Sequence, residues 1–358
     1  MREGLGPFTH TIEITREISM IAIDGSEGEG GGQVLRNACA LSLVTGEPFT
    51  IEKIRAKRDQ PGLMRQHLTS IEAACAIGGA RCEGLELGSN RIVFRPGSVT
   101  AGDYRFAVGT AGSTALVLQA VLIPLALADK PSHLVIEGGT HAGMAPSFDF
   151  IEKCFLPVLE RMGPRVCARI KRHGFFPRGG GRIEIDIEPA PLRRIECTER
   201  GGLHCRSGMI VFSSLGENKI PNRIRKAALK ALPAWDEEMI AIRDLPADQG
   251  PGIALSLETN YENVTEVVSG FGKIGLSAER IGNTAGKRMA GYEASKAFAG
   301  PYLQDQLLLP MALAGGGTFT TVKISEHTRS AGDIIALFTG RRAHFEDAGD
   351  KGHCVRIV

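Results

Sequence analysis

A weak internal repeat constrains the fold of this chain more than any other feature of its sequence. Each copy has a Gly-rich turn, an apolar helix, a strand, a second helix and further strand. The copies begin at Gly28, at Gly109 and near Gly300, so the third copy starts after a much longer interval than the second. Helices and strands that alternate in this way predict an α/β fold in which helices pack on sheets.

Apolar periodicity and turn residues define the expected elements of the three copies. Copy one is expected to contain the helix 33–44, the strand 49–54, the helix 64–77 and the strand 91–94. Copy two is expected to contain the helix 113–128, the strand 133–137, the helix 148–162 and the paired strands 165–173 and 181–187. Copy three is expected to contain the helix 302–314, the strand 318–324 and a helix that begins just after His327.

The delay before copy three predicts an inserted domain with its own strands and helix. The expected elements of this insert are the strand 203–212, the helix 222–232 and the strands 253–258 and 263–271. The chain is therefore divided into an N-terminal extension at 1–19, a large domain of three repeats at 20–191 and 287–358, and a small inserted α/β domain at 192–286.

The charge balance limits how this chain can bind a polyanion. Lys and Arg number 42 and Asp and Glu number 40, which gives a formal net charge of +2. Binding to a polyanion must therefore use a local basic patch, because the global field is nearly neutral. Aromatic residues make up only 6% of the chain, which argues against a stacking platform for single-stranded nucleic acid.

The cysteines and the apolar segments indicate a reducing compartment. None of the eight cysteines forms a C-x-x-C pair, so neither a zinc site nor a redox motif is expected. The leading residues 1–19 have no continuous apolar stretch of the kind found in secretory signals. The longest apolar run, 115–128, is short for a membrane span and is interrupted by Gln119 and Pro124. We expect a cytoplasmic protein that does not enter the membrane.

The turn at 24–33 (DGSEGEGGGQ) is the first candidate site. Glycines ahead of a helix expose backbone N–H groups beside the positive end of the helix dipole, which suits a phosphate. Three carboxylates, Asp24, Glu27 and Glu29, would repel that phosphate unless a divalent metal were shared between them. A flexible acidic turn is the structural alternative. The segment is not a Walker loop, because no G-K-[ST] ends it.

Two basic stretches are further candidates. Arg55, Lys57, Arg58 and Arg65 lie close together in the sequence, and Arg65 would open the second helix of copy one. Guanidinium groups bind phosphate oxygens through paired hydrogen bonds. A second stretch, 169–182 (RIKRHGFFPRGGGR), has the same character. In both cases a solvated basic face is the alternative to a phosphate site.

Two polar residues stand out by their position in the repeat. Gln119 is a lone polar residue in an apolar helix, where its amide needs either a ligand or core backbone as a partner. His327 follows a strand, and a lone histidine at such a position usually has a structural role. However, His327 occupies the place that Arg65 has in copy one and Pro146 has in copy two, so the three turns are expected to converge on one cleft.

Seven blocks of this sequence closely resemble successive blocks of the RNA 3′-terminal phosphate cyclase family. They cover nearly the whole chain apart from the first eighteen or so residues and much of the insert, and they are IDGSEGEGGGQVLRNACALSLVTGEPF, PGLMRQHL, ELGSNRIVFRPG, GDYRFAVGTAGSTALVLQ, HGFFPRGGG, YLQDQLLLPMALAGGG and EHTR. The resemblance implies three repeated α/β units, similar to the C-terminal domain of translation initiation factor 3 and to EPSP synthase, with a small inserted α/β domain.

The resemblance also implies a reaction. ATP adenylylates a histidine, AMP passes to an RNA 3′-phosphate, and the neighbouring 2′-hydroxyl expels AMP to leave a 2′,3′-cyclic phosphate. The family's nucleophile matches His327, and its metal-side acidic residue matches Glu29, which would act with Mg or Mn. The nucleotide contacts match Gln119, Pro146, Tyr302, Asp305 and Gln306, and Arg36, Arg55, Arg58 and Arg65 fall in basic blocks that would face RNA and phosphate.

The chain departs from the family pattern directly after the histidine. The family commonly has H-x-x-T-N-I, whereas this chain has His327-Thr328-Arg329-Ser330-Ala331-Gly332. The missing threonine–asparagine pair leaves the cap of the following helix unsettled. Two alternatives remain at this point: a non-enzymatic relative that acts in ribosome assembly, and an enolpyruvyl transferase on the same fold. The sequence also leaves open whether the protein forms a homo-oligomer.

Overall fold

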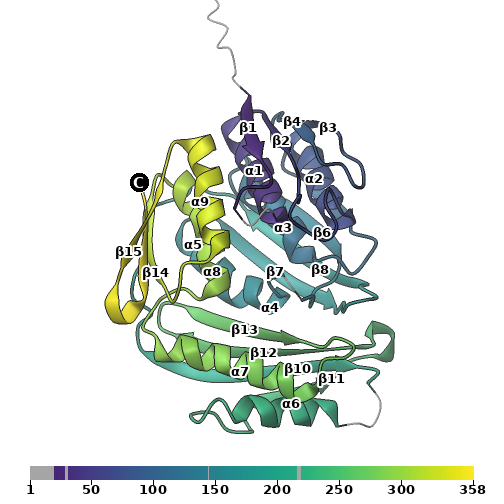
Figure 1. The fold of residues 1–358 in the computed structure, drawn as a ribbon, viewed down its shortest axis with the longest axis vertical. Coiled ribbons are helices and arrows are strands. Elements are labelled where there is room, and N and C mark those ends of the chain that lie inside the picture. The colour runs from purple at the N-terminus through teal and green to yellow at the C-terminus, as the bar shows by residue number, and fades with distance from the viewer. Residues whose placement is uncertain (1–19, 29–30, 144, 216–218) are drawn as a thin grey trace, which may run out of the picture.

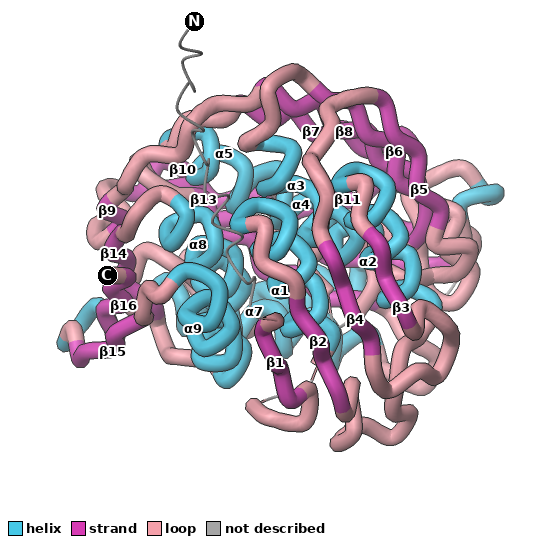
Figure 2. Tube along the Cα trace, turned by 90° about the horizontal axis from the view of Figure 1, so that it is seen from above, coloured by secondary structure: helices cyan, strands magenta, loops and turns pink. Residues whose placement is uncertain are grey.

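A computed structural model of the chain describes residues 20–28, 31–143, 145–215 and 219–358. The strands of these residues form four four-stranded sheets, and the expected α/β class is confirmed. Seen from above, the helices gather in the middle of the large domain and the strands of three sheets lie around them (Figure 2). The fourth sheet belongs to the insert and lies below this assembly (Figure 1).

The first sheet is built by β1 (Ile21–Asp24), β2 (Phe49–Glu52), β3 (Arg81–Glu83) and β4 (Ile92–Arg95). Its order is β1-β2-β4-β3, with β1 and β2 parallel and the other pairs antiparallel. Two helices accompany it, α1 (Gly32–Thr45) and α2 (Arg65–Gly78). Each ends at a glycine in the left-handed conformation, Gly46 and Gly79, which terminates the helix without side-chain strain.

The second sheet repeats this connectivity. It contains β5 (Asp103–Ala107), β6 (Ser132–Gly138), β7 (Arg165–Arg172) and β8 (Gly181–Glu188) in the order β5-β6-β8-β7. The first helix is α3 (Thr114–Ala126), and the second is built from α4 (Phe148–Phe150), the π-helical turn η1 (Ile151–Phe155) and α5 (Leu156–Arg161). The expected continuous helix 148–162 therefore contains a π-helical turn, directly ahead of Pro157, which has no N–H to donate.

The third sheet has the same connectivity but is interrupted by the insert. It contains β9 (Glu196–Cys197), β14 (Gly317–Thr321), β15 (Ala343–Asp347) and β16 (His353–Ile357), with the helices α8 (Pro301–Leu313) and α9 (Glu326–Thr339) and the short 3-10 turn η3 (Gly349–Lys351). The strand β9 is parallel to β14, as β1 is to β2 and β5 is to β6. The third unit thus begins before the insert and resumes after it.

The insert consists of β10 (Leu203–Ser213), α6 (Ile220–Leu229), β11 (Ile240–Asp244), the 3-10 turn η2 (Ala247–Gln249), β12 (Gly252–Tyr261), β13 (Thr265–Phe271) and α7 (Ala278–Ala294). The helices α6 and α7 pack together on one face of its sheet (Figure 1). These elements do not coincide with the expected limits of 192 and 286. The first limit lies ahead of β9, which pairs with β14 of the large domain, and the second falls inside α7.

The core of the large domain involves helices of all three units. The helix α3 is buried over almost its whole length, as expected for a helix that is apolar on every side. The helix α1 packs against both α3 and α9, and α9 packs against α8. This packing brings the loops at the starts of the helices together. No helix of the described ranges is both long enough and apolar enough to cross a membrane.

Candidate active site

His327 lies in the first turn of α9, one residue later than the start of this helix at Glu326. The expectation that the helix begins after His327 is therefore wrong by two residues. The side chain of Ser325 caps the helix, because its Oγ accepts a hydrogen bond of 3.0 Å from the Thr328 amide. Ser325 thus supplies the cap that the absent threonine–asparagine pair left unsettled, and the His327 residue is exposed.

Asp305 of α8 fixes the start of α9. Its Oδ1 accepts hydrogen bonds from Thr328 Oγ1 at 2.6 Å and from Ser325 Oγ at 3.1 Å. The helix that carries His327 is therefore tied to the helix that carries Asp305 and Gln306. In the structure, Asp305, which the resemblance placed at the nucleotide, holds the cap of α9.

A line of polar side chains connects the first helices of all three units. Arg36 of α1 donates from Nε to Gln119 Oε1 of α3 at 2.8 Å, and Gln119 Nε2 donates to Gln306 Oε1 of α8 at 3.0 Å. The partners of the lone Gln119 are therefore side chains from the other two units. The sequence left open whether a ligand or core backbone binds the Gln119 amide, and in the structure two side chains bind it.

Arg36 carries a buried positive charge. Only 8% of the residue is exposed, and burial lowers the pKa of its guanidinium to about 10, so the group is still protonated at neutral pH. No carboxylate of the described residues contributes to that shift. Keeping an uncompensated cation away from water is costly. The arrangement suits a site in which an anionic ligand completes the charge balance.

The expected nucleotide residues Gln119, Asp305 and Gln306 line one cleft between α1, α3, η1 and α8. The cleft also exposes Gln33 and Asn37, which are spaced four apart on α1 and therefore share one face of that helix. Its apolar lining consists of Leu118, Leu122, Ile123, Ile151, Phe155, Leu309 and Pro310. The sequence interpretation missed Gln33 and Asn37, although their spacing beside Arg36 was a signal.

The Gly-rich turn passes close to α9. Gly28 has φ +56, and a Cβ placed on it would lie 2.1 Å from Ser330 Oγ. Since Ser330 follows His327 by three residues, both lie near the same face of the helix. Only glycine combines this backbone conformation with so close an approach. The turn therefore runs alongside the helix face that presents His327.

The other side of the turn faces basic side chains. A Cβ on Gly31 would lie 3.3 Å from Arg58 Nη2, and one on Gly32 would lie 2.8 Å from Arg36 Nη1. A Cβ on Gly32 would also lie 2.5 Å from His67 Nε2. Three nitrogen-bearing side chains from α1, α2 and the loop before α2 thus meet the start of α1.

His67 is a residue that the sequence interpretation did not assign, although it lies in the block PGLMRQHL. It is buried, and its Nδ1 accepts a hydrogen bond of 3.0 Å from the Met64 amide. The proton of the neutral ring therefore resides on Nε2, which faces Gly32. Burial, together with the charges of Arg36 and Arg55, lowers the pKa of His67 to about 3. His67 is a neutral hydrogen-bond donor at the turn.

Two basic residues that were expected at the phosphate site, Arg55 and Arg65, lie in different surroundings. Arg55 has φ +54, and its Nη1 donates to the Gly62 carbonyl at 3.0 Å, so its side chain stabilises the loop before α2. Arg65 is the exposed first residue of α2. The structure therefore brings Arg36 and Arg58 to the Gly-rich turn, while Arg55 serves the loop.

The stretch 169–182 is paired with carboxylates. Lys171 and Arg182 contact Glu184 at 3.2 and 2.8 Å, Arg169 pairs with Asp186, and Arg172 pairs with Asp248 of the insert. Three carboxylates thus serve four cations of the stretch, and the fifth, Arg178, donates to the Gly250 carbonyl at 3.1 Å. Part of the stretch therefore attaches the insert to the large domain, through Arg172 and Arg178.

The described residues do not form a metal site. Asp24 Oδ1 accepts from the Ser26 amide at 2.9 Å and from Ser26 Oγ at 2.6 Å, while Oδ2 lies 2.6 Å from Lys53 Nζ. Lys53 and Ser26 hold the pKa of this carboxyl well below its usual range. No group of three or more His, Cys, Asp or Glu side chains within the described ranges could hold a metal ion. Glu29, the expected metal residue, lies outside these ranges.

Pro146 and Tyr302 lie at the starts of two neighbouring helices. Pro146 is buried and precedes Ser147, the N-cap of α4, and Tyr302 is the second residue of α8. The Phe150 ring meets the Tyr302 ring edge-on, with centroids 5.8 Å apart. The starts of α4 and α8 are therefore packed together, and the nucleotide role of Pro146 and Tyr302 stays a prediction.

Comparison with known proteins agrees with this architecture. Residues 27–345 match the family model described as RTC, RNA 3′-terminal phosphate cyclase. The chain is 49% identical over 342 residues to the RNA 3′-terminal phosphate cyclase of Koribacter versatilis (strain Ellin345), covering 95% of each chain. It is 45% identical over 321 residues to the protein of the same name from Ralstonia nicotianae (strain ATCC BAA-1114 / GMI1000), covering 89% of this chain and 91% of the relative. The chain belongs to the RNA 3′-terminal phosphate cyclase family.

Proposed function

We propose that this protein converts an RNA 3′-phosphate into a 2′,3′-cyclic phosphate with ATP, through a covalent His327–AMP. The observation that carries the proposal is the position of His327. It is exposed at the start of α9, and Asp305 ties this helix start to the cleft of Gln119 and Gln306. A helix start attracts anions, so the polyphosphate of ATP is drawn to the position where a nucleophile stands.

The reaction proceeds in three displacements at phosphorus. An imidazole nitrogen of His327 attacks the α-phosphorus of ATP, the bond to the bridging oxygen breaks, and pyrophosphate leaves as the ring loses its proton. An oxygen of the RNA 3′-phosphate then attacks the same phosphorus and displaces the imidazole, giving RNA(3′)pp(5′)A. Finally the 2′-hydroxyl attacks the 3′-phosphorus, gives up its proton and expels AMP. The neutral imidazole is a nucleophile near pH 7 and needs no activating base.

The protein's main task in such displacements is to neutralise charge and to position the groups. The buried Arg36 guanidinium, Arg58 and the Nε2–H of His67 surround the Gly-rich turn, where they can bind phosphate oxygens. The hydrogen bonds from Arg36 to Gln119 and from Gln119 to Gln306 keep these side chains in fixed orientations. Pro146 and Tyr302 then remain for the base.

The metal, the RNA substrate and the location of the protein are further parts of the proposal. A divalent metal, Mg or Mn held with Glu29, would neutralise phosphate charge, but no step above is assigned to it because the described residues do not form its site. RNA with a 3′-phosphate end is the substrate, and the last step requires its 2′-hydroxyl. A cytoplasmic location stays a prediction from the sequence, which leaves open whether the protein forms a homo-oligomer.

Family membership and the two named relatives favour a cyclase over the alternatives raised by the sequence. An enolpyruvyl transferase has no use for an exposed histidine at this helix start. A non-enzymatic relative lacks the nucleophile, whereas His327 is present and exposed in this chain.

The nucleophile is tested by incubating wild type and His327→Asn with ATP labelled at the α-phosphate. Wild type should acquire an acid-labile covalent label, and His327→Asn should acquire none because its amide is not nucleophilic. Thermal unfolding of both proteins is the control for folding. A folded His327→Asn protein that takes label at the wild-type rate would rule out His327.

The order of steps is tested with RNA that ends in a 3′-phosphate on a 2′-deoxyribose. This RNA should accept AMP and then stall, because it has no adjacent hydroxyl to close the ring. The adduct is visible as a shifted band on a denaturing gel. If ordinary RNA cyclised while the deoxy-terminated RNA received no AMP, the three-step pathway would be wrong.

A further inference from the structure

The insert reaches the start of α4 through a serine pair. Ser269 of β13 lies 2.8 Å, oxygen to oxygen, from Ser147. Ser147 Oγ also accepts a hydrogen bond of 3.2 Å from the Phe150 amide, as the N-cap of α4. Either hydroxyl can donate in the serine pair, because each Oγ carries one proton and two lone pairs. Since Ser147 directly follows Pro146, this contact fixes the residue that we place at the nucleotide.

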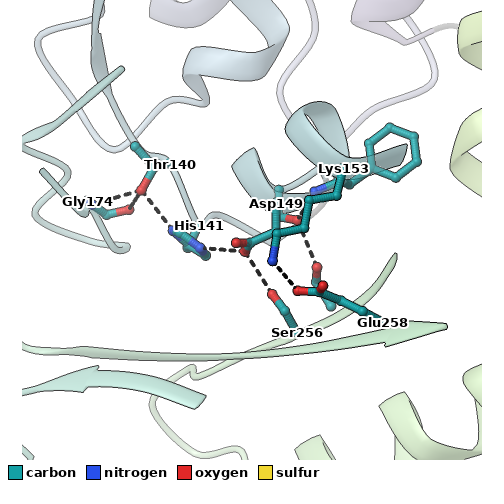
Figure 3. Close-up of polar contacts among 10 residues, drawn as sticks. Thr140, His141, Asp149, Lys153, Gly174, Ser256 and Glu258 are labelled. Carbon is teal, nitrogen blue, oxygen red and sulfur yellow. Dashed lines mark hydrogen bonds and ion pairs between the residues drawn. The ribbon is translucent and has the colours of Figure 1, made fainter. Parts of the chain in front are cut away.

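A second contact from the neighbouring strand secures the same loop. Ser256 of β12, the cross-strand partner of Ser269, donates to Asp149 Oδ2 at 2.7 Å (Figure 3). The same oxygen lies 3.0 Å from His141 Nε2. His141 and Asp149 stand at the two ends of the loop that contains Pro146. The insert therefore holds a loop whose ends are already joined to each other.

The buried ends of this network are satisfied. His141 Nδ1 lies 2.8 Å from Thr140 Oγ1, and that hydroxyl accepts from the Gly174 amide at 3.0 Å. Which atom donates in the two contacts of His141 depends on the tautomer of its ring. A buried chain of hydrogen bonds with every member satisfied stiffens the residues that it joins, and here it holds His141 and Asp149 together. Lys153 adds an ion pair of 2.5 Å to Glu258 of β12 beside it (Figure 3).

The strand β13 also reaches the start of α8. Glu266 Oε2 accepts a hydrogen bond of 3.2 Å from the Gly300 amide, and Gly300 is the N-cap of α8, two residues before Tyr302. Glu266 is 1% exposed. A Cβ on Gly300 would lie 2.0 Å from Glu266 Oε1, so only glycine allows this approach. One strand of the insert therefore contacts both helix starts that carry the expected base contacts.

We propose that Ser269 and Glu266 of β13 are positioning residues that set the spacing between Pro146 and Tyr302, and so shape the nucleotide pocket of the large domain. The insert then has a defined part in ATP binding without touching ATP. This inference rests on the proposed function, in which Pro146 and Tyr302 contact the nucleotide. Small displacements of a binding group cost much of its affinity, which is why a rigid support matters.

The test compares Ser269→Ala, Glu266→Val and Glu266→Gln with wild type and with Thr265→Ala. Thr265 lies on the same strand but makes none of the described contacts to α4 or α8. Covalent labelling by ATP gives KM and kcat, fluorescence anisotropy gives the affinity for 3′-phosphate RNA, and thermal unfolding gives stability.

We expect Ser269→Ala and Glu266→Val to raise the KM for ATP about fivefold to tenfold, the effect of losing one hydrogen bond. Their kcat and RNA affinity should change much less, since His327 and the arginines stand elsewhere. Glu266→Gln keeps an oxygen acceptor for the Gly300 amide and should restore the wild-type KM. Thr265→Ala should match wild type throughout.

If Ser269 and Glu266 only stabilised the fold, the variants would behave differently. Ser269→Ala and Glu266→Val would then lower the melting temperature yet leave the KM for ATP unchanged at temperatures where the protein is folded, which would overturn the proposal. If Glu266→Val does not fold, Ser269→Ala and Ser256→Ala decide the question by the same measurement. Failure of the proposed function would be distinct, because wild type itself would then take no label.

Discussion

Thr328 Oγ1 lies 2.6 Å from Asp305 Oδ1, and this hydrogen bond joins the first turn of α9 to α8. The two helices belong to the same unit, but the contact fixes His327 relative to the cleft formed with the other two units. The position of His327 therefore depends on a carboxylate of the neighbouring helix.

Asp305→Ala should slow covalent labelling at saturating ATP by about tenfold to a hundredfold. Thr328 and Ser325 would lose their common acceptor, at a cost of about 1–3 kcal/mol for buried hydroxyls left without a partner, and the first turn of α9 would loosen. Single-turnover labelling and thermal unfolding measure the two effects. Asp333→Ala, an exposed carboxylate on the same helix, is the matched control. An unchanged labelling rate in Asp305→Ala would contradict this role.

Gln119→Leu should destabilise the protein and weaken ATP binding. The substitution preserves approximate size but leaves Arg36 Nε without its acceptor at 2.8 Å and separates Arg36 from Gln306. We expect the free energy of unfolding to fall by about 1–3 kcal/mol, as for a buried charged donor that loses its partner. Urea unfolding measures this change, and saturating ATP should restore part of it. If Gln119→Leu were as stable as wild type, water would have replaced the amide as the acceptor for Arg36 Nε.

Gly28→Ala should reduce labelling more than Gly46→Ala does. Both glycines have positive φ, +56 and +78, so both substitutions strain the backbone. Only at Gly28 would the new Cβ meet a neighbour, 2.1 Å from Ser330 Oγ, whereas nothing lies within 4 Å at Gly46. Labelling rates normalised to the folded fraction isolate the effect at the turn. Equal rates would show that the turn need not approach α9 for the reaction.

Glu266→Gln should gain stability over wild type as the pH rises from about 5 to 8. Burial raises the pKa of Glu266 to about 8, far above its ordinary value of 4.5. The unfolded chain therefore releases this proton first, and wild type loses stability as the pH rises through that window. The glutamine side chain of the variant has no proton to release in this range. Urea unfolding at several pH values gives the difference, and two curves that stay parallel would refute the raised pKa.

The depressed pKa of His67, about 3, acts in the opposite direction on both proteins. Below about pH 6.5 the His67 ring of the unfolded chain binds a proton, whereas the buried ring of the folded protein stays neutral. Wild type and Glu266→Gln therefore both lose stability as the pH falls. Because this contribution is common to wild type and Glu266→Gln, it cancels when their stabilities are compared at each pH.

Local pattern was enough to predict the α/β class, most helices and the position of His327 in the repeat. Helix and strand periodicity and glycine turns are properties of neighbouring residues, so they can be recognised before any packing is known. The two-residue strand β9 was missed because it is too short to show a period, and with it the start of the third unit. The π-helical turn at 151–155 was missed because its apolar pattern continues that of a helix.

The site itself was decided by tertiary structure. Gln119 showed in the sequence only as an isolated polar residue, and packing of α1, α3 and α8 gave it Arg36 and Gln306 as partners. Four cations of the basic stretch 169–182 became ion pairs because β8 and the insert place carboxylates beside them. Sequence alone determined which groups are present. Which of them meet depends on contacts between residues far apart in the chain, and these form only when the helices of the three units and the strands of the insert pack together.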